Sequence, residues 1–292
     1  QEARRQRQMC IRDSINSKFF VNSKLNFAEN LLAKNSNQKA ITFVSENGYR
    51  EQKSWKELNI DVKKIITFYK KINISEKDRI AAYTPNQIET VECFLGASAI
   101  GSIWSSCSPD FGVAGVIERF SQIKPKLLVI TDKYYYNGKE INIIERLPKI
   151  LKKIKSIKSV LILNYPGKKL RKFNKIKNIK IYNFTEIKKL EISRNKLKKF
   201  DFDHELAILY SSGTTGKPKC ICHRSGGVLL QHLKEHQLHC NIKPNDNVFY
   251  FTTCGWMMWN WLVTALASKA SILLFDGFPM YKSPELLLKI AN

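Results

Sequence analysis

The sequence predicts an α/β fold in which mostly parallel sheets are flanked by helices. Short apolar runs of the kind that form buried strands alternate with longer segments whose apolar residues recur at helical spacing. The chain has 292 residues, enough to bury a substantial core as one large domain or two small ones. No apolar run reaches the roughly 18 residues that indicate a membrane span, so no membrane partner is expected.

The elements of the first half follow from turn and capping signals. Residues 40–44 predict a strand, and residues 48–50 predict a turn into a second strand. Ser54 and Glu57 have capping-box spacing and predict the start of a helix. The apolar stripe of this helix is expected to comprise Leu58, Val62, Ile65, Ile66 and Tyr69. The same half contains predicted strands at 78–83, 102–106, 127–131 and 160–163, and a predicted helix at 87–100.

The second half repeats the alternation of strands and helices. Strands are predicted at 206–209, 220–222, 248–252 and 271–275, and helices at 226–240, 258–267 and 284–290. The last of these helices has no capping glycine after it, which indicates a chain that stops in mid-fold.

Cysteine usage and the first residues predict a cytoplasmic (cytosolic) protein. Seven cysteines are scattered along the chain, no Cys-x-x-Cys pair occurs, and Cys220 and Cys222 are expected to share one face of a strand. We interpret them as buried free thiols in a reducing compartment. Residues 1–12 are charged and lack the apolar region of a secretory signal.

The positive charge is concentrated in one segment. Residues 149–199 hold 18 Lys and Arg against two acids, and so supply +16 of the net charge of +24. A nucleic-acid-binding face and a solvated lysine-rich surface are both open interpretations. The segment is rich in Lys, Ile and Asn and has no interleaved aromatic and arginine residues, which favours the solvated surface and no nucleic-acid partner.

Residues 210–219 form a stretch suited to phosphate between two apolar runs. The glycines allow positive φ and close backbone approach, successive N–H groups form an anion nest, and the lysines supply charge. The stretch is not a Walker A loop, because only two residues separate Gly213 from Gly216 and Pro218 follows Lys217. Pro218 directs the chain into a strand instead of a helix. An ordinary polar hairpin is the alternative.

The order of residues in this loop resembles the phosphate loop of the adenylate-forming enzymes, the superfamily of acyl-CoA synthetases and luciferases. Residues 20–32, 54–58 and 96–112 resemble further segments of the superfamily, in the same order. Within it, similarity to the acetoacetyl-CoA synthetases rests on 104–112, 136–139, 231–236 and 255–261. The resemblance implies an acid–thiol ligase that uses ATP, Mg²⁺ and coenzyme A and passes through an acyl-adenylate.

The resemblance also implies which residues act. Contacts to the ATP triphosphate or its Mg²⁺ are expected from Ser211, Ser212, Gly213, Thr214, Thr215, Gly216 and Lys219, with Thr214 or Thr215 beside the metal. The acyl pocket is expected to comprise Trp256, Met257, Met258, Trp259 and Asn260. Core packing is the alternative for this aromatic run. Lys139 is expected to meet a coenzyme A phosphate or to be a solvated turn lysine.

The acyl group is expected to be acetoacetate. Acetyl-CoA synthetases typically carry Trp-Val-Thr-Gly-His where this chain has Trp256, Met257 and Met258 followed by Trp and Asn. The runner-up is an acetyl-, propionyl- or other acyl-CoA ligase. A non-catalytic nucleotide-binding remnant and a lysine-rich nucleic-acid binder are the alternatives from other classes.

Histidines supply no predicted metal site. His232, His236 and His239 recur at i, i+4 and i+7, a spacing that can hold a metal, but no carboxylate or cysteine accompanies them in the pattern. We interpret this segment as an amphipathic helix. His223 is expected either to line the nucleotide site or to end a strand, and Arg224 stands where the family has a small hydroxyl residue.

The later motifs of the superfamily are absent from the sequence, including the segment that touches adenine and the carboxyl-terminal-domain lysine that aligns carboxylate and phosphate. Residues 1–292 are therefore expected to form an incomplete amino-terminal adenylating domain, with 149–199 as a variable segment. No catalytic residue is assigned within it, and the chain alone is expected to be inactive.

Overall fold

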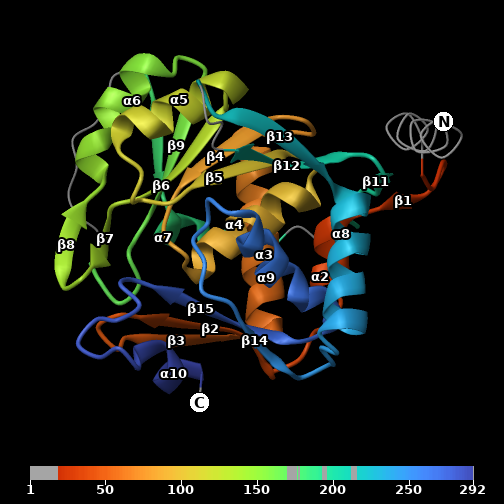
Figure 1. Cartoon of the computed structure of the whole chain (residues 1–292). Helices are drawn as coiled ribbons and strands as arrows, with labels where there is room; N and C mark the ends of the chain where they lie inside the picture. The colour runs from red at the N-terminus through yellow and green to blue at the C-terminus, as the bar shows by residue number, and fades with distance from the viewer. Residues whose placement is uncertain (1–18, 170–175, 177, 193–195, 212–215, 292) are drawn as a thin grey trace, which may run out of the picture.

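The computed structural model describes residues 19–169, 176, 178–192, 196–211 and 216–291. A seven-stranded sheet and a four-stranded sheet lie with helices between them, and other helices cover their outer faces (Figure 1). A two-sheet arrangement of this kind confirms the predicted α/β class.

The larger sheet contains most of the predicted strands. In spatial order its strands are β10 (Lys180–Asn183), β9 (Ser159–Leu163), β6 (Leu127–Thr131), β4 (Arg79–Tyr83), β5 (Ile103–Cys107), β12 (Glu205–Ser211) and β13 (Lys219–Arg224). Neighbouring strands are parallel except β12 and β13, which form an antiparallel hairpin. The prediction that the chain continues as a strand after Pro218 is confirmed.

The smaller sheet has the order β14 (Asn247–Phe249), β15 (Ser271–Asp276), β2 (Lys39–Ser45) and β3 (Arg50–Ser54). Its first two pairs are parallel and β2 with β3 is antiparallel. β14 ends earlier than the predicted strand 248–252. Thr252 is not part of the strand, and its carbonyl accepts a hydrogen bond from Asn86 Nδ2 (3.4 Å).

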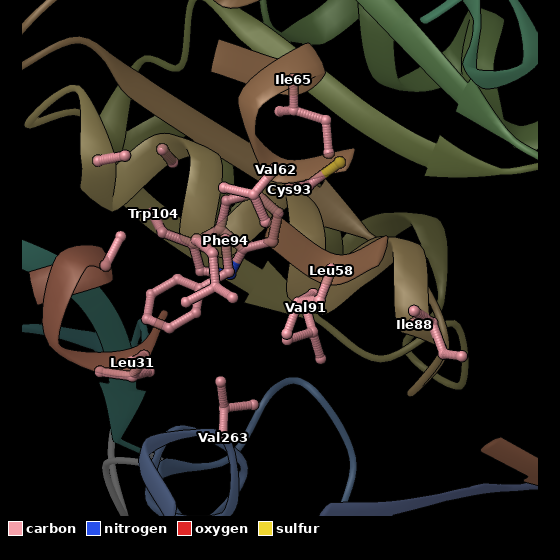
Figure 2. Close-up of a cluster of buried hydrophobic side chains, with 14 of the residues drawn as sticks. Leu31, Leu58, Val62, Ile65, Ile88, Val91, Cys93, Phe94, Trp104 and Val263 are labelled. Atoms are coloured by element: carbon pink, nitrogen blue, oxygen red, sulfur yellow. The ribbon is translucent and has the colours of Figure 1, made fainter. Parts of the chain in front are cut away.

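Helices α3 (Trp55–Lys71), α4 (Ile88–Ala99) and α9 (Met257–Thr264) lie between the two sheets (Figure 1). The predicted capping box starts α3: Glu57 N–H donates to Ser54 Oγ (3.2 Å) and Ser54 N–H donates to Glu57 Oε2 (2.8 Å). Its predicted apolar stripe is buried. Every residue of α4 is buried, and Phe94 lies at the centre of the cluster in Figure 2.

Several elements were not predicted from the sequence. Two of them, α5 (Val113–Ile123) and α6 (Leu147–Lys153), cover the outer face of the larger sheet, whereas the predicted α10 (Leu286–Ala291) covers the smaller one. The other unpredicted elements are α2 (Phe27–Leu31), α7 (Phe184–Ile187), β10 (Lys180–Asn183), β1 (Lys24–Leu25) paired with β11 (Phe200–Asp201), β7 (Lys133–Tyr136) paired with β8 (Lys139–Asn142), and a 3-10 turn at Ile144–Arg146.

Two predicted helices end in irregular turns. The helix predicted at 226–240 is α8 (Ser225–Lys234) followed by a π-helical turn, Glu235–His239. The helix predicted at 258–267 is α9 followed by a 3-10 turn, Ala265–Ser268. Across the described residues, none of the helices combines the length and the apolar character needed to cross a bilayer.

The prediction that the cysteines are buried is wrong for three of the six that the structure describes, and Cys10 lies outside the described residues. Cys93, Cys107 and Cys254 are buried free thiols, whereas the free thiols Cys220, Cys222 and Cys240 are exposed. Two of the exposed thiols lie on β13, an edge strand with a neighbour on one side only, and the third follows the π-helical turn.

Lysines of the 149–199 segment that the structure describes are all exposed. On α6 and the turn after it the apolar residues Leu151, Ile154 and Ile157 face the core, and Lys152, Lys155 and Lys158 point to solvent. This alternation is the amphipathic pattern of an ordinary covering helix.

Candidate active site

Side-chain hydrogen bonds join the carboxyl ends of strands from both sheets. The Ser106 hydroxyl, on β5, donates to Cys254 O in the loop after β14 (2.6 Å). The Tyr165 hydroxyl, after β9, donates to Asp276 Oδ2 at the end of β15 (3.1 Å). Desolvation raises the pKa of Asp276 to about 7, and the bond from Tyr165 partly opposes this rise. These bonds form a seam between the two sheets at the carboxyl ends of their strands, where α/β proteins bind their ligands.

Asn86, in the loop that follows β4, is the centre of this seam. Its Nδ2 donates to Thr252 O and to Phe275 O (both 3.4 Å), and its Oδ1 accepts from Trp259 Nε1 (2.9 Å). The side chain is 2% exposed. Asn86 was given no role from the sequence, although a polar residue soon after the carboxyl end of a strand is a signal for such a position. We call this the Asn86 junction.

The predicted acyl-pocket residues divide between surface and core. Trp256 is 61% exposed and Met257 is 44% exposed, and Met258 is half-buried. Trp259 is fully buried, and its ring meets Phe94 edge to face at a centroid distance of 5.5 Å. Core packing, the alternative that the sequence left open, therefore holds for Trp259.

Asn260 is also buried, but it differs from Trp259 in having an unsatisfied group. Its Oδ1 makes no hydrogen bond within the described part of the chain. A buried amide without a partner is costly, because it loses its contacts with water and gains none in exchange. Asn260 Oδ1 therefore has an unused capacity to accept a hydrogen bond.

Gly255 brings two distant motifs together. A Cβ built on Gly255 would lie 3.4 Å from Ser108 N and 3.5 Å from the Phe111 ring, so this backbone rests on the 104–112 motif at the end of β5. Both stretches resemble the same family at sequence level, and the fold makes them one surface.

The loop that the sequence predicts to bind phosphate joins the carboxyl end of β12 to β13. We call β12, this loop and β13 the phosphate hairpin. Ser211 and Lys219 are register partners at the last described pair of the hairpin, and Lys219 is exposed. Gly216 has φ +107°, and a Cβ there would have no atom of the described residues within 4 Å. Space beside a left-handed glycine allows an anion to approach the backbone. The predicted contacts Ser212, Gly213, Thr214 and Thr215 lie outside the described residues.

The base of the hairpin is anchored on neighbouring strands and helices. Gln122 Nε2, on α5, donates to Pro218 O (3.0 Å), and the Ser105 hydroxyl donates to the Tyr210 hydroxyl (3.1 Å). Burial raises the pKa of the Tyr210 phenol, so Tyr210 stays neutral and acts as a hydrogen-bonding anchor.

Lys139 follows a tight turn that a buried carboxylate holds in place. Glu46 Oε2 accepts from Asn137 N–H and Glu46 Oε1 accepts from Gly138 N–H (both 2.8 Å). Glu46 Oε2 also accepts from Phe278 N–H (2.8 Å), so one side chain joins the β7–β8 turn to the loop after β15. Lys139 itself is exposed. Glu46 could not be found from the sequence, because its partners lie far away along the chain.

The three helical histidines do not share one face. The π-helical turn adds a residue to that part of the helix, and His239 is exposed whereas His232 and His236 are buried. Burial lowers the pKa of both buried imidazoles to about 4. His223 is half-buried on β13, and burial lowers its pKa too.

The chain belongs to the AMP-binding enzyme family, whose model matches residues 28–292. It is 43% identical over 274 residues to acetoacetyl-CoA synthetase of Gallus gallus, an alignment covering 92% of this chain and 41% of that protein. It is 34% identical over 287 residues to malonamoyl-CoA synthetase vrtB of Penicillium aethiopicum, covering 91% of this chain and 38% of that protein.

A solved structure agrees with these relatives. Acetoacetyl-CoA synthetase from Streptomyces lividans superimposes with a TM-score of 0.87 at 31% identity, covering 94% of this chain and 42% of that chain. The chain thus spans about two fifths of the length of the curated relatives it matches.

Proposed function

We propose that residues 1–292 form the amino-terminal part of the adenylating domain of an acetoacetate–CoA ligase. The observation that carries the proposal is the packing of the 255–260 run against the 104–112 motif, at the strand ends where the phosphate hairpin also lies. Similarity to acetoacetyl-CoA synthetases over more than nine tenths of the chain supports it. The 149–199 segment is proposed to be a variable, solvated surface.

The reaction has two steps. A carboxylate oxygen of acetoacetate attacks the α-phosphorus of MgATP, and the bond to the bridging oxygen breaks to release diphosphate. The thiol sulfur of coenzyme A then attacks the acyl carbon, the bond to AMP breaks, and the thiol proton passes to solvent. Activation is needed because a carboxylate by itself is a poor acylating agent.

The phosphate hairpin is proposed to hold the departing β- and γ-phosphates. Lys219 supplies charge and Ser211 a hydroxyl, from facing positions on the two strands. The open left-handed turn at Gly216 fits close approach of a phosphate oxygen. Holding these groups in place lowers the barrier by orientation and by charge stabilisation. Thr214 or Thr215 is proposed to meet the Mg²⁺ that ATP carries.

The acyl group is proposed to lie against Trp256, Met257 and Met258. Flexible methionines can shape a cavity for a four-carbon acid. The Nδ2 amide group of Asn260 is proposed to donate to the 3-keto oxygen, which can only accept. Trp259 does not line this pocket and instead fixes the run to the core through Asn86. Lys139 is proposed to meet a phosphate of coenzyme A.

A comparison of two relatives favours a second class of acyl substrate. The named acyl groups of two relatives, acetoacetyl and malonamoyl, both carry a carbonyl at C3. A second candidate substrate class is therefore the other short acids with a carbonyl at C3. Free thiols on the exposed β13 support the proposal of a reducing, cytosolic location.

The complete polypeptide that the gene encodes should catalyse acetoacetate-dependent exchange between ATP and diphosphate. Its kcat/KM should separate acetoacetate from butyrate more than butyrate from propionate. One methylene in an apolar pocket is worth only about 10–200-fold, whereas an unmet polar group costs more. If acetate or butyrate is the best substrate, the acetoacetate assignment is wrong and a general acyl-CoA ligase remains.

A further inference from the structure

The 231–236 motif has no role in the function proposed so far, yet it places a histidine beside the acyl run. His232 lies on α8, which packs on α9 (Figure 1). Its Nδ1 is 3.0 Å from Thr264 Oγ1, on α9. Only 5% of the residue is exposed, so the ring has little access to bulk water.

The hydrogen bonds around Thr264 fix the tautomer of His232. The Thr264 hydroxyl donates to Asn260 O (2.6 Å), and a hydroxyl has only one hydrogen to give. Thr264 Oγ1 must therefore accept from His232, and Nδ1 carries the hydrogen. Burial lowers the pKa of His232 to about 4, so the ring is neutral near pH 7. Nε2 consequently keeps a free lone pair.

Nε2 has no hydrogen-bond partner among the residues that the structure describes, and the ring lines a cavity. The cavity has a volume of about 520 Å³. Its lining combines apolar and polar residues: Gly227, Val228, Met257, Cys222, His223, Arg224, Gln231, His232 and Glu235. Met257 belongs to the proposed acyl run, so the cavity is continuous with that surface. A cavity whose apolar walls carry a few polar groups is typical of a small-molecule subsite.

We infer that His232 is a specificity-determining residue: its Nε2, together with Met257, receives the C3 end of the acyl group. This inference rests on the proposed function and extends it to α8. Nε2 carries no hydrogen and can only accept a hydrogen bond, and a ketone oxygen can also only accept. A water molecule therefore bridges the two by donating to each. A hydroxyl or amide at C3 donates to Nε2 directly. A plain methylene satisfies neither arrangement.

Two substitutions separate the two ring nitrogens. His232→Asn retains an amide N–H near the place of Nδ1, so it keeps the bond to Thr264 and loses Nε2. His232→Gln reaches the place of Nε2 and loses the bond to Thr264. His236→Phe, one helical turn further along and outside the cavity, is the control for a change of a buried imidazole.

The measurement is kcat/KM of the complete gene product for acetoacetate, 3-hydroxybutyrate and butyrate, together with KM for ATP and the melting temperature. The wild type should prefer both oxygenated acids to butyrate. His232→Asn should lower the preference for acetoacetate over butyrate by roughly three- to tenfold, the worth of one hydrogen bond. KM for ATP and the melting temperature should stay as in the wild type. His236→Phe should leave the preference unchanged.

Three results would overturn parts of this account, and they are distinguishable. Wild-type enzyme that does not activate acetoacetate overturns the proposed function. Active wild type with an unchanged preference in His232→Asn overturns only the role of Nε2. If the variants fail to fold, the ¹⁵N resonance of Nε2 in wild-type protein is followed instead. A shift on adding acetoacetate, absent with butyrate, supports the inference, and identical spectra contradict it.

Discussion

The phosphate hairpin and the Asn86 junction lie at the strand ends of the same sheet, but their described residues are held very differently. In the hairpin, Gly216 and Lys219 are exposed, and the turn depends on a positive φ. In the junction, Asn86 and Trp259 are buried and joined to each other and to two backbone carbonyls. One region is shaped by local backbone and the other by long-range packing.

This difference separates binding from folding. A side chain that projects from an exposed hairpin can be removed without opening the core, so its loss should be felt in ligand binding alone. A side chain in the junction supports both sheets, so its loss should be felt in stability first. Trp256 and Trp259 of the acyl run are only three residues apart, yet they lie on opposite sides of this boundary, because Trp256 is exposed and Trp259 is buried.

Trp259→Ala should have the largest effect on stability. It removes a fully buried indole and leaves Asn86 Oδ1 without its donor, and such truncations cost about 3–5 kcal/mol. Trp256→Ala is the matched control, because that ring is exposed and its loss should change the free energy of unfolding by less than about 0.5 kcal/mol. Urea denaturation followed by far-UV circular dichroism measures both. Equal losses in the two variants would erase the proposed boundary.

Lys219→Ala should have the next largest effect, on chemistry instead of stability. Removing one group that stabilises developing charge typically costs about 10²–10³-fold in rate. The free energy of unfolding should stay within about 0.5 kcal/mol of the wild type, because the side chain is exposed. Lys234, on α8, is also exposed, so Lys234→Ala is the control for the loss of one charge. Wild-type rates of ATP–diphosphate exchange in Lys219→Ala would remove Lys219 from the phosphate site.

Local signals explain which parts of the fold could be predicted. The capping box at Ser54 and the buried runs of β4, β5, β6 and β9 depend on neighbouring residues, and all were predicted correctly. Helix α5 was missed although Val116, Phe120 and Ile123 have helical spacing, because it starts at Gly112 without a side-chain cap. The helical spacing of these three apolar residues was a signal from which α5 could have been predicted.

Long-range contacts explain the rest. The early end of β14 and the burial of Trp259 both depend on Asn86, whose partners lie more than 160 residues away along the chain. Glu46 is hidden for the same reason, since its three donors come from two other loops. A motif predicts that a run of residues belongs to a site, but the fold decides which of them face the ligand.

His236→Phe should make the free energy of unfolding depend less on pH than it does in the wild type. Burial lowers the pKa of His236 to about 4, below the value of about 6.5 expected in the unfolded chain. Between these values the unfolded state binds more protons, so the stability contributed by the neutral ring is complete above pH 6.5 and is lost as pH falls through 4. The ring packs edge to face on Trp261 at 4.4 Å, a contact that phenylalanine can keep. The variant should therefore lose less stability than the wild type between pH 6.5 and 4, as measured by urea denaturation, whereas parallel pH profiles would contradict a buried neutral imidazole.

The smallest effect is expected far from both regions, in the lysine-rich segment. Lys152, Lys155 and Lys158 are exposed, and charges in water are screened over about 8 Å at physiological ionic strength. Changing all three to glutamine should leave kcat/KM for ATP and for coenzyme A within about twofold of the wild type at fixed salt. A basic surface can nonetheless raise the encounter rate of anionic substrates. A loss that grows with each lysine removed, and disappears at high salt, would mean that this surface steers ATP or coenzyme A toward the site instead of only keeping the helix solvated.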